Sequence, residues 1–280
     1  MLTGFDHATL TLLDLDRALA SYTKLLGQPP RWRGGHPDIG LRGALFGLEN
    51  GWLELLAPVP DADESIALRQ ALAARGDRLT TLSFRCDDAA ACTAMLRAQG
   101  IRATPPQEGE AHGDDGQTRR YRLVELSPRA TRGLAISIVE RPQGSMPALG
   151  AFAPALPSSI DHLVLRSADL EAALALYGKG LGLRLALDTT FAGVRMLFFR
   201  LGGVTIEVVH DPSVGDDDVL LGIAYRVADL PGAHARLAAA GFDLGPLRPG
   251  NKPGTEVFTV RGGTNGLPTL FLRDPSRDRS

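Results

Sequence analysis

Residues 6–27 read DHATLTLLDLDRALASYTKLLG, and residues 161–182 read DHLVLRSADLEAALALYGKGLG. Placed one above the other without a gap, at an offset of 155 positions, both stretches open with Asp-His and end with Gly. The identical positions between these ends include Leu15 and Leu170, Ala18 and Ala173, Leu19 and Leu174, Tyr22 and Tyr177, and Lys24 and Lys179. A match this dense predicts two copies of one structural unit.

Each copy opens with alternating residues that predict a β-strand, followed by an Asp-Leu turn and a helix. The helices are expected at residues 15–26 and 170–181, and Gly27 and Gly182 are expected to end them. Further strands are expected at RGALFGL and GWLELLAP in the first copy, and at RMLFFRL and VTIEVVHD in the second.

A weaker repeat lies within each half of the chain. Residues 81–101 align with residues 222–242, and each segment again reads as strand, turn, helix and Gly, with two strands after it. We therefore expect an α+β fold of four βαβββ modules, paired two by two with curved mixed sheets around a cleft. Proline, glycine, alanine and serine predict a linker at 143–158 between domains at 1–142 and 159–280.

Composition narrows the classes of function. The chain has 280 residues and a net charge of −2, from 30 basic and 32 acidic residues without long runs of either sign. This balance argues against a nucleic-acid or membrane-surface partner. The two cysteines, the absence of a visible secretory signal and the lack of a long apolar run predict a soluble cytoplasmic protein. A homodimer is compatible with the sequence.

Strand alternation suggests which side chains share a face. If His7 faces the cleft, Thr9 faces it too, and Trp52 accompanies Glu54 on a later strand. His7 and Glu54 would then form a dyad in which Glu54 fixes the imidazole and His7 moves a proton. The alternative is a buried hydrogen-bonded pair without a catalytic role.

A second candidate is the loop of Gly34, Gly35, His36 and Pro37, in which paired glycines allow a close approach to a ligand and His36 is a donor or base. The alternative is a loop whose glycines serve turn geometry. Arg42, Arg85 and Arg132 are candidates for bringing positive charge to a carboxylate or enolate, and Thr81 for a further contact.

These features resemble the vicinal oxygen chelate superfamily, which includes glyoxalase I, extradiol dioxygenases, methylmalonyl-CoA epimerase and bleomycin-resistance proteins. The resemblance rests on the Asp-His strands, the Asp-Leu-x-x-Ala-Leu-x-x-Tyr helices and the strands that hold Glu54 and Glu207. It covers nearly the whole chain. The first half also looks like the glyoxalase-like subgroup with a Gly-Gly-x-His-Pro motif, on residues 34–37.

The resemblance implies four cleft positions in each half, which active members fill with His and Glu to bind Zn, Ni, Fe or Mn. In the first half these positions read His7, Glu54, Thr81 and Ser137. In the second half they read His162, Glu207, Gly222 and Leu270. Each half thus keeps one His and one Glu, so a metal on His7 and Glu54 is an open alternative, and His162 with Glu207 is interpreted as a remnant.

Three functions follow from the resemblance. The first is a lyase or isomerase that abstracts a proton from a small oxygenated metabolite in the first-half cleft, using His7, Glu54 and His36. The second is a non-catalytic protein that sequesters a small molecule, as bleomycin-resistance proteins do. The third is an extradiol-type dioxygenase, which the missing ligands disfavour.

Overall fold

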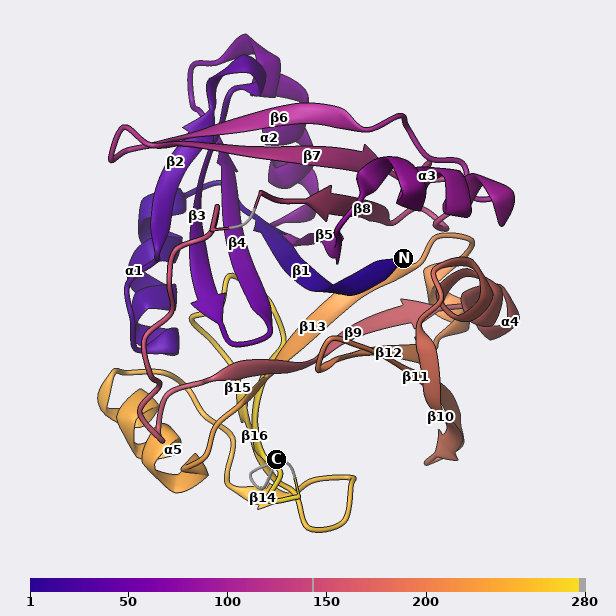
Figure 1. Ribbon diagram of the computed structural model, residues 1–280. Helices are drawn as coiled ribbons and strands as arrows, with labels where there is room; N and C mark the ends of the chain where they lie inside the picture. Colours follow the sequence, from indigo (N-terminus) through magenta and orange to yellow (C-terminus); the bar gives the residue numbers. More distant parts are fainter. Residues whose placement is uncertain (143, 277–280) are drawn as a thin grey trace. The chain divides into compact units, whose positions relative to one another are not determined.

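The computed structural model describes residues 1–142 and 144–276, and Figure 1 shows its helices and strands. Gln143, where the expected linker begins, and residues 277–280 of the expected second domain lie outside the described residues. The elements form an α+β fold with mixed sheets, as expected. Those of the first half are β1 (Leu2–Thr11), α1 (Leu15–Leu26), β2 (Trp32–His36), β3 (Leu41–Leu48), β4 (Gly51–Pro58), α2 (Ile66–Arg75), β5 (Arg78–Cys86), α3 (Ala89–Ala98), β6 (Gln107–Gly113), β7 (Thr118–Glu125) and β8 (Ala135–Glu140).

The second half repeats this order, except that its described residues have no counterpart of α2. Its elements are β9 (Ser159–Ser167), α4 (Leu170–Ala173), a π-helical segment (Leu174–Gly180), β10 (Arg184–Phe191), β11 (Val194–Leu201), β12 (Val204–His210), β13 (Val219–Arg226), α5 (Leu230–Ala239), β14 (Arg248–Pro249), β15 (Glu256–Val260) and β16 (Thr269–Arg273). No helix in the described ranges is long and apolar enough to cross a membrane.

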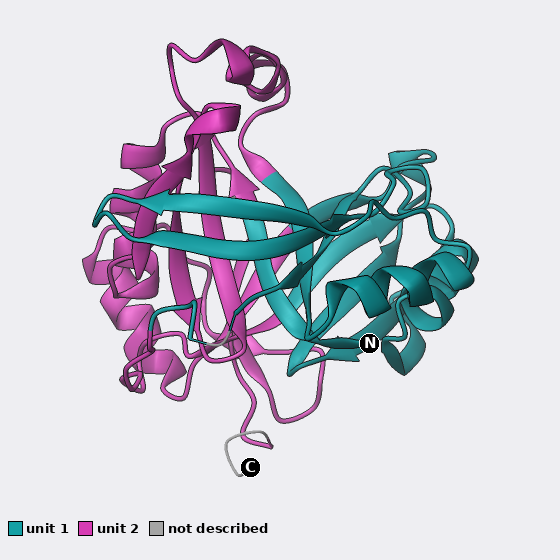
Figure 2. Ribbon diagram, turned by 45° about the horizontal axis from the view of Figure 1, so that its top comes forward, with its two compact units in different colours: residues 1–9, 79–147, 162–221 teal, residues 10–78, 148–161, 222–280 magenta. Residues whose placement is uncertain are grey.

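The chain divides into two compact units, shown in Figure 2. Unit 1 comprises residues 1–9, 79–147 and 162–221, and unit 2 comprises residues 10–78, 148–161 and 222–280. Each unit therefore takes segments from both halves of the sequence. Unit 1 contains the second and third repeats, and unit 2 contains α1 to α2 together with the fourth.

The same ladder recurs within these units. In unit 1, β5 pairs in parallel with β8, which continues antiparallel to β7 and β6. The third repeat does the same with β9, β12, β11 and β10. In unit 2, β13 pairs in parallel with β16, followed by β15 and β14. A first strand parallel to a last strand requires a helical crossover between them, which explains the strand–helix–three-strand order in the sequence.

Helix α1 confirms the expectation for residues 15–26. Asp14 caps its first turn by accepting from the Arg17 backbone N–H at 3.0 Å, and Gly27 ends it in the left-handed conformation with φ 68°. Its buried stripe is Ala18, Leu19, Tyr22, Leu25 and Leu26. The counterpart helix begins as expected at Leu170 but becomes π-helical from Leu174, a form that the amphipathic pattern does not predict.

Alternation along the strands of unit 1 separates an apolar face from a polar one. Leu82, Phe84, Ile136 and Ile138 are buried on the face where α3 packs against β7 and β8. The intervening residues of the same strands include Thr81, Ser83, Arg85 and Ser137. Because successive side chains of a strand point to opposite faces, these polar side chains share the face away from α3. The candidate site lies on this face.

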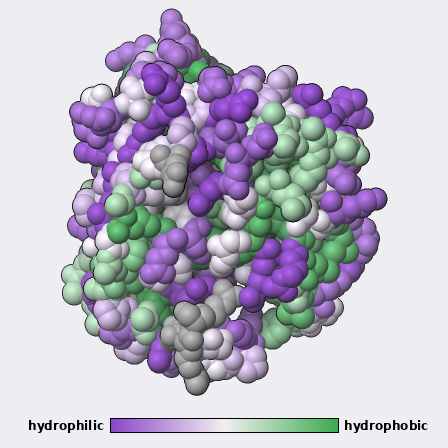
Figure 3. All heavy atoms as spheres, viewed as in Figure 1, coloured by the Kyte–Doolittle hydropathy of each residue, from purple (hydrophilic) through white to green (hydrophobic). Residues whose placement is uncertain are grey.

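Hydrophilic residues cover most of the surface seen in Figure 3, with smaller hydrophobic areas between them. Several of the most exposed large apolar side chains belong to β10, where Leu187 is 52% and Phe191 49% exposed. Scattered exposed apolar residues are normal for folded proteins.

Candidate functional site

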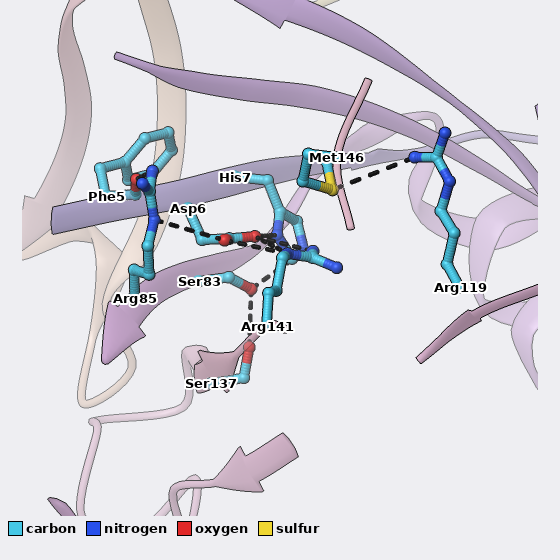
Figure 4. Close-up of polar contacts among 9 residues, drawn as sticks. All are labelled: Phe5, Asp6, His7, Ser83, Arg85, Arg119, Ser137, Arg141 and Met146. Carbon is cyan, nitrogen blue, oxygen red and sulfur yellow. Dashed lines mark hydrogen bonds and ion pairs between the residues drawn. The ribbon is translucent and has the colours of Figure 1, made fainter. Parts of the chain in front are cut away.

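His7 lies on β1 in unit 1, and both of its ring nitrogens have polar neighbours (Figure 4). Its Nδ1 lies 2.6 Å from Asp6 Oδ1, and its Nε2 lies 3.0 Å from Ser83 Oγ. The ring is mostly enclosed, with 12% of the side chain exposed, and the Asp6 side chain is almost fully buried. Two hydrogen bonds, one with the adjacent residue Asp6 and one with Ser83 on β5, therefore fix the plane of the imidazole.

The Asp6 carboxylate is held in its ionised form. Arg141 donates to it with two nitrogens, Nη2 to Oδ1 at 2.8 Å and Nε to Oδ2 at 3.1 Å, and Arg85 Nε lies 3.8 Å from Oδ2. Burial alone would raise the pKa of Asp6, but the hydrogen bond with His7 and the charges of Arg141 and His7 outweigh burial and hold that pKa well below its usual range. An ionised carboxylate is only an acceptor, so His7 Nδ1 must carry the proton.

Two serines extend the network beyond His7. Ser83 on β5 and Ser137 on β8 are register partners, and their hydroxyl oxygens lie 2.6 Å apart. When the His7 ring is neutral and carries its proton on Nδ1, Nε2 accepts from Ser83, and the Ser83 oxygen is then free to accept from Ser137. Ser83 is fully buried, whereas Ser137 is 7% exposed. The result is a continuous chain from Asp6 through His7 and Ser83 to Ser137.

This chain has the parts that a proton relay needs. A buried carboxylate next to an imidazole fixes its tautomer and stabilises the imidazolium that forms when the ring takes a second proton. Hydroxyl groups can pass a proton because each is both a donor and an acceptor. A proton accepted at Ser137 can therefore reach His7 Nε2 without movement of the heavy atoms.

Three arginines lie around this network. Besides Arg141 and Arg85, Arg119 on β7 points toward the same region in Figure 4, where its Nη1 lies 4.0 Å from Met146 Sδ. Arg141 also lies over the ring of Tyr121, with its Cζ 5.7 Å from the ring centroid. The site thus combines a proton-relay chain with a concentration of guanidinium groups.

The second half keeps only part of this arrangement. In unit 1, His162 Nε2 lies 3.7 Å from Glu207 Oε2, an ion-pair distance rather than a hydrogen bond. The strands of unit 2 carry Ala224 paired with Leu270, where the first half pairs Ser83 with Ser137. The relay hydroxyls are therefore replaced by apolar side chains in the second half.

The sequence-derived candidates are divided between the two units. His7, Thr81 and Arg85 share unit 1 with Thr9, which is buried. Arg132 also lies in unit 1, but its Nε donates to the buried Asp218 carboxylate at 2.9 Å. The remaining candidates, Glu54, Trp52, Arg42 and His36, belong to unit 2.

The Gly34–Pro37 segment corrects one expectation, because its glycines do not form a loop. Gly34, Gly35 and His36 lie in strand β2, and Pro37 begins a short 3-10 turn. Gly35 pairs with Arg42 on β3, and a Cβ at Gly35 would lie 2.5 Å from the Leu41 carbonyl oxygen. Glycine is needed here for the close approach of two strands.

Sequence reasoning missed three residues of the network, which are Asp6, Ser83 and Arg141, and the nearby Arg119. Asp6 belongs to the Asp-His pair that recurs in both halves, and this recurrence is the sequence feature that could have indicated its role. Ser83 lies two residues after the expected Thr81, on the same face of β5, and only the register of β5 with β8 identifies it. Arg119 and Arg141 carry no local motif.

Comparison with known proteins agrees with this architecture. A family model described as a glyoxalase-like domain matches residues 5–153. A second model, described as the Glyoxalase/Bleomycin resistance protein/Dioxygenase superfamily, matches residues 159–277. The chain belongs to the glyoxalase-like domain family. A search of curated protein sequences gives no match.

Two solved structures resemble nearly the whole chain. A triple variant of 4-hydroxymandelate synthase from Streptomyces coelicolor has a TM-score of 0.71 at 15% identity, over 97% of this chain and 92% of that one. A Mn(II)-bound glyoxalase from Novosphingobium aromaticivorans has a TM-score of 0.69 at 16% identity, over 97% of this chain and 82% of that one. At these identities the likeness shows a shared fold, and one fold supports many reactions.

The Novosphingobium aromaticivorans glyoxalase is bound to Mn(II), and a divalent metal ion at His7 would need further donors beside this histidine. In the described ranges, no three His, Cys, Asp or Glu side chains come together in a way that could hold one. His7 Nε2, which a metal would need, is bonded to Ser83, and the next groups in the chain are neutral hydroxyls. A catalytic zinc normally has three protein ligands of the His, Cys or carboxylate type. The donor set around His7 does not fit a resident metal.

Proposed function

We propose that this protein is a lyase- or isomerase-type enzyme that moves a proton on a small oxygenated metabolite, without a resident metal, at the Asp6–His7–Ser83–Ser137 chain. The observation that carries the proposal is this unbroken series of hydrogen bonds, which ends at Ser137, where 7% of the residue is exposed. The second half lacks both hydroxyls and is proposed to have no such activity.

The proposed step is proton abstraction beside a carbonyl group. The C–H bond of the substrate breaks, and its electrons form an enolate. The proton goes to Ser137 Oγ, while the Ser137 proton passes to Ser83 and the Ser83 proton passes to His7 Nε2. The His7 imidazolium is then paired with the Asp6 carboxylate, and the return of the proton to a different atom completes the isomerisation.

Other sequence-derived roles stay proposals. Glu54 as a partner of His7, and His36 as an oxyanion or substrate contact, belong to this group. So do ligand contacts by Thr9, Trp52, Thr81, Arg42, Arg85 and Arg132. We also propose domain limits of 1–142 and 159–280, membership of the first half in the Gly-Gly-x-His-Pro subgroup, a cytoplasmic location and a homodimer.

A second candidate is a non-catalytic protein that binds and sequesters a small molecule. The full burial of Ser83 and the engagement of both His7 nitrogens support it, because a satisfied polar network also stabilises a fixed cavity wall. This candidate predicts ligand-dependent thermal stabilisation with no chemical change in the ligand.

The test is solvent hydrogen exchange in D₂O, followed by ¹H NMR, on a panel of small 2-oxo acids and hydroxyketones. We expect the wild type to speed exchange of the proton beside the carbonyl, and His7→Gln to lose at least about 100-fold of that rate, the usual contribution of a general base. His162→Gln is the matched control at the repeated position. A loss in His162→Gln alone would move the site to the second half, and equal losses in both variants would show that the effect is not specific to the His7 network. The absence of exchange with any compound that binds would favour sequestration.

A further inference from the structure

A row of three residues crosses neighbouring strands of unit 1 and ends beside the His7 network. On β6 and β7, Gly109 is the register partner of Tyr121. The register of β7 with β8, extended by one position, brings Tyr121 opposite Arg141, which directly follows β8. Arg141 has the same parity as Ser137, so the row lies on the face of the sheet that carries the network.

The Tyr121 ring occupies the space over Gly109. A Cβ at Gly109 would collide with Cε2 and Cζ of this ring, so only glycine leaves room for the ring over β6. The same ring packs against the guanidinium group of Arg141, whose Cζ lies 5.7 Å from the ring centroid. A cation at this distance is attracted by the ring face. The position of the ring therefore restricts the orientation of the Arg141 guanidinium group.

Arg141 connects this ring to the carboxylate that fixes His7 (Figure 4). Its Nη2 lies 2.8 Å from Asp6 Oδ1 and its Nε lies 3.1 Å from Oδ2, a two-point contact that depends on the plane of the guanidinium group. Asp6 Oδ1 is also the atom that lies 2.6 Å from His7 Nδ1. A guanidinium group turned out of this plane would release the carboxylate from its fixed orientation toward His7.

The fourth repeat offers an internal comparison, because its row lacks both the ring and the cation. Arg226 on β13 aligns with Arg85 on β5, and there Arg226 Nη2 holds the repeated Asp161 at 2.6 Å. In the first half, by contrast, Arg85 Nε lies 3.8 Å from Asp6 Oδ2, and Arg141 makes the close contacts. Aligned on these arginines, the positions of the row in the fourth repeat hold Gly250, Thr255 and Asp274.

We propose that Tyr121 is a positioning residue for proton transfer, whose ring holds the Arg141 guanidinium group in the plane that fixes Asp6 against His7 Nδ1. Gly109 makes room for this ring. The inference rests on the proposed function, because the orientation of Asp6 affects the reaction only if His7 accepts the proton. The Tyr121 hydroxyl takes no part in this role, so phenylalanine should replace tyrosine here.

The test combines a spectroscopic measurement with a rate. Long-range ¹H–¹⁵N NMR of the His7 side chain, assigned by the loss of its signals in His7→Gln, shows which ring nitrogen carries the proton. We expect the Nδ1–H form in the wild type and in Tyr121→Phe, and a mixture of the two tautomers in Tyr121→Leu and Gly109→Ala.

The rate is that of hydrogen exchange in D₂O on pyruvate and hydroxyacetone. It should fall about tenfold in Tyr121→Leu and in Gly109→Ala, the size expected for the loss of one cation–π contact, and stay near the wild-type rate in Tyr121→Phe. Thr255→Ala is the matched control at the repeated position and should change neither readout. Urea unfolding curves check that each variant folds.

The outcomes separate this role from the proposed function. Where the wild type exchanges, an unchanged His7 tautomer or an unchanged rate in folded Tyr121→Leu would overturn the role of Tyr121, as would equal losses in Tyr121→Phe and Tyr121→Leu. If Tyr121→Leu does not fold, the same readouts in Gly109→Ala decide, because that variant leaves every side chain of the network in place. A wild type that exchanges neither compound, yet loses its Nδ1–H form in Tyr121→Leu, would reject the proposed function and keep the positioning role.

Discussion

Asp6 is the residue on which the His7 network depends, because it both fixes the imidazole tautomer and accepts the charge of Arg141. The sequence predicted that His7 carries the chemistry and that Glu54 is its carboxylate partner. Adjacent residues of a strand normally point to opposite faces, so alternation alone does not predict that Asp6 reaches His7. The short contact depends on the position of Arg141, which lies far away in the sequence.

The low pKa of Asp6 makes stability depend on pH in a definite direction. A carboxyl group whose pKa is lower in the folded state contributes stability above its unfolded pKa, which is about 3.9, and this contribution is lost as the pH falls toward the folded value. We expect the contribution of Asp6 to the free energy of unfolding, measured with urea, to stay about constant between pH 5 and 7. Below about pH 4 this contribution should fall. Asp6→Asn should remove most of that acid-side decrease. An identical pH profile in the variant would show that Asp6 is not held as described.

At the scale of elements, the four repeated modules could be predicted from the sequence because strand alternation, Asp caps and terminal glycines are local signals. The bounds of α1 agree with the expectation for residues 15–26. The conformations of β2 and of the segment Leu174–Gly180 could not be predicted in this way, because their glycines are not a specific signal for a strand or a π-helix. The glycines of β2 suggested a loop, although the close pairing of β2 with β3 requires Gly35. Gly178 and Gly180 lie in the π-helical segment that replaces a regular α-helix.

Gly35→Ala tests the reason for the paired glycines. A Cβ at Gly35 would lie 2.5 Å from the Leu41 carbonyl oxygen, so β2 and β3 would have to separate. We expect a loss of about 1–3 kcal/mol in the free energy of unfolding, as for other overpacked sites. Gly4→Ala on β1 is the control, because a Cβ there would meet no atom within 4 Å. Equal stability of the two variants would contradict the close-approach explanation.

At the scale of the whole molecule, the two halves of the sequence do not correspond to the two compact units. Unit 1 joins residues 79–147 of the first half to residues 162–221 of the second. Within it, Arg132 donates to Asp218, and the Asp218 backbone N–H donates to the Arg132 carbonyl at 2.7 Å. Sequence alone could not predict this pairing, because such contacts depend on tertiary packing between distant segments. Arg132 was instead expected near the ligand.

Removal of Arg132 should therefore weaken unit 1. The Asp218 side chain is fully buried, and burial raises the pKa of Asp218, which the ion pair with Arg132 only partly offsets. We expect Arg132→Met to lower the free energy of unfolding by about 3–5 kcal/mol, because it leaves a buried charge without its partner. The double variant with Asp218→Asn should lose less than the sum of the single losses in a urea-based double-mutant cycle. Strict additivity would show that the pair does not couple the two segments.

The central claim is that Ser83 and Ser137 pass protons to His7, and Ser83→Ala tests it most directly. The position of the second half that corresponds to Ser83 is Ala224 on β13, where the alanine is fully buried. We therefore expect β5 to accommodate alanine at position 83. The measurement is the rate of substrate hydrogen exchange in D₂O by ¹H NMR, with the urea unfolding curve as a check on folding. We expect at least about a 100-fold loss of exchange in a variant that still folds, with a loss of about 1–3 kcal/mol in the free energy of unfolding because His7 and Ser137 lose a buried hydrogen-bond partner. A wild-type exchange rate in the folded variant would contradict the relay.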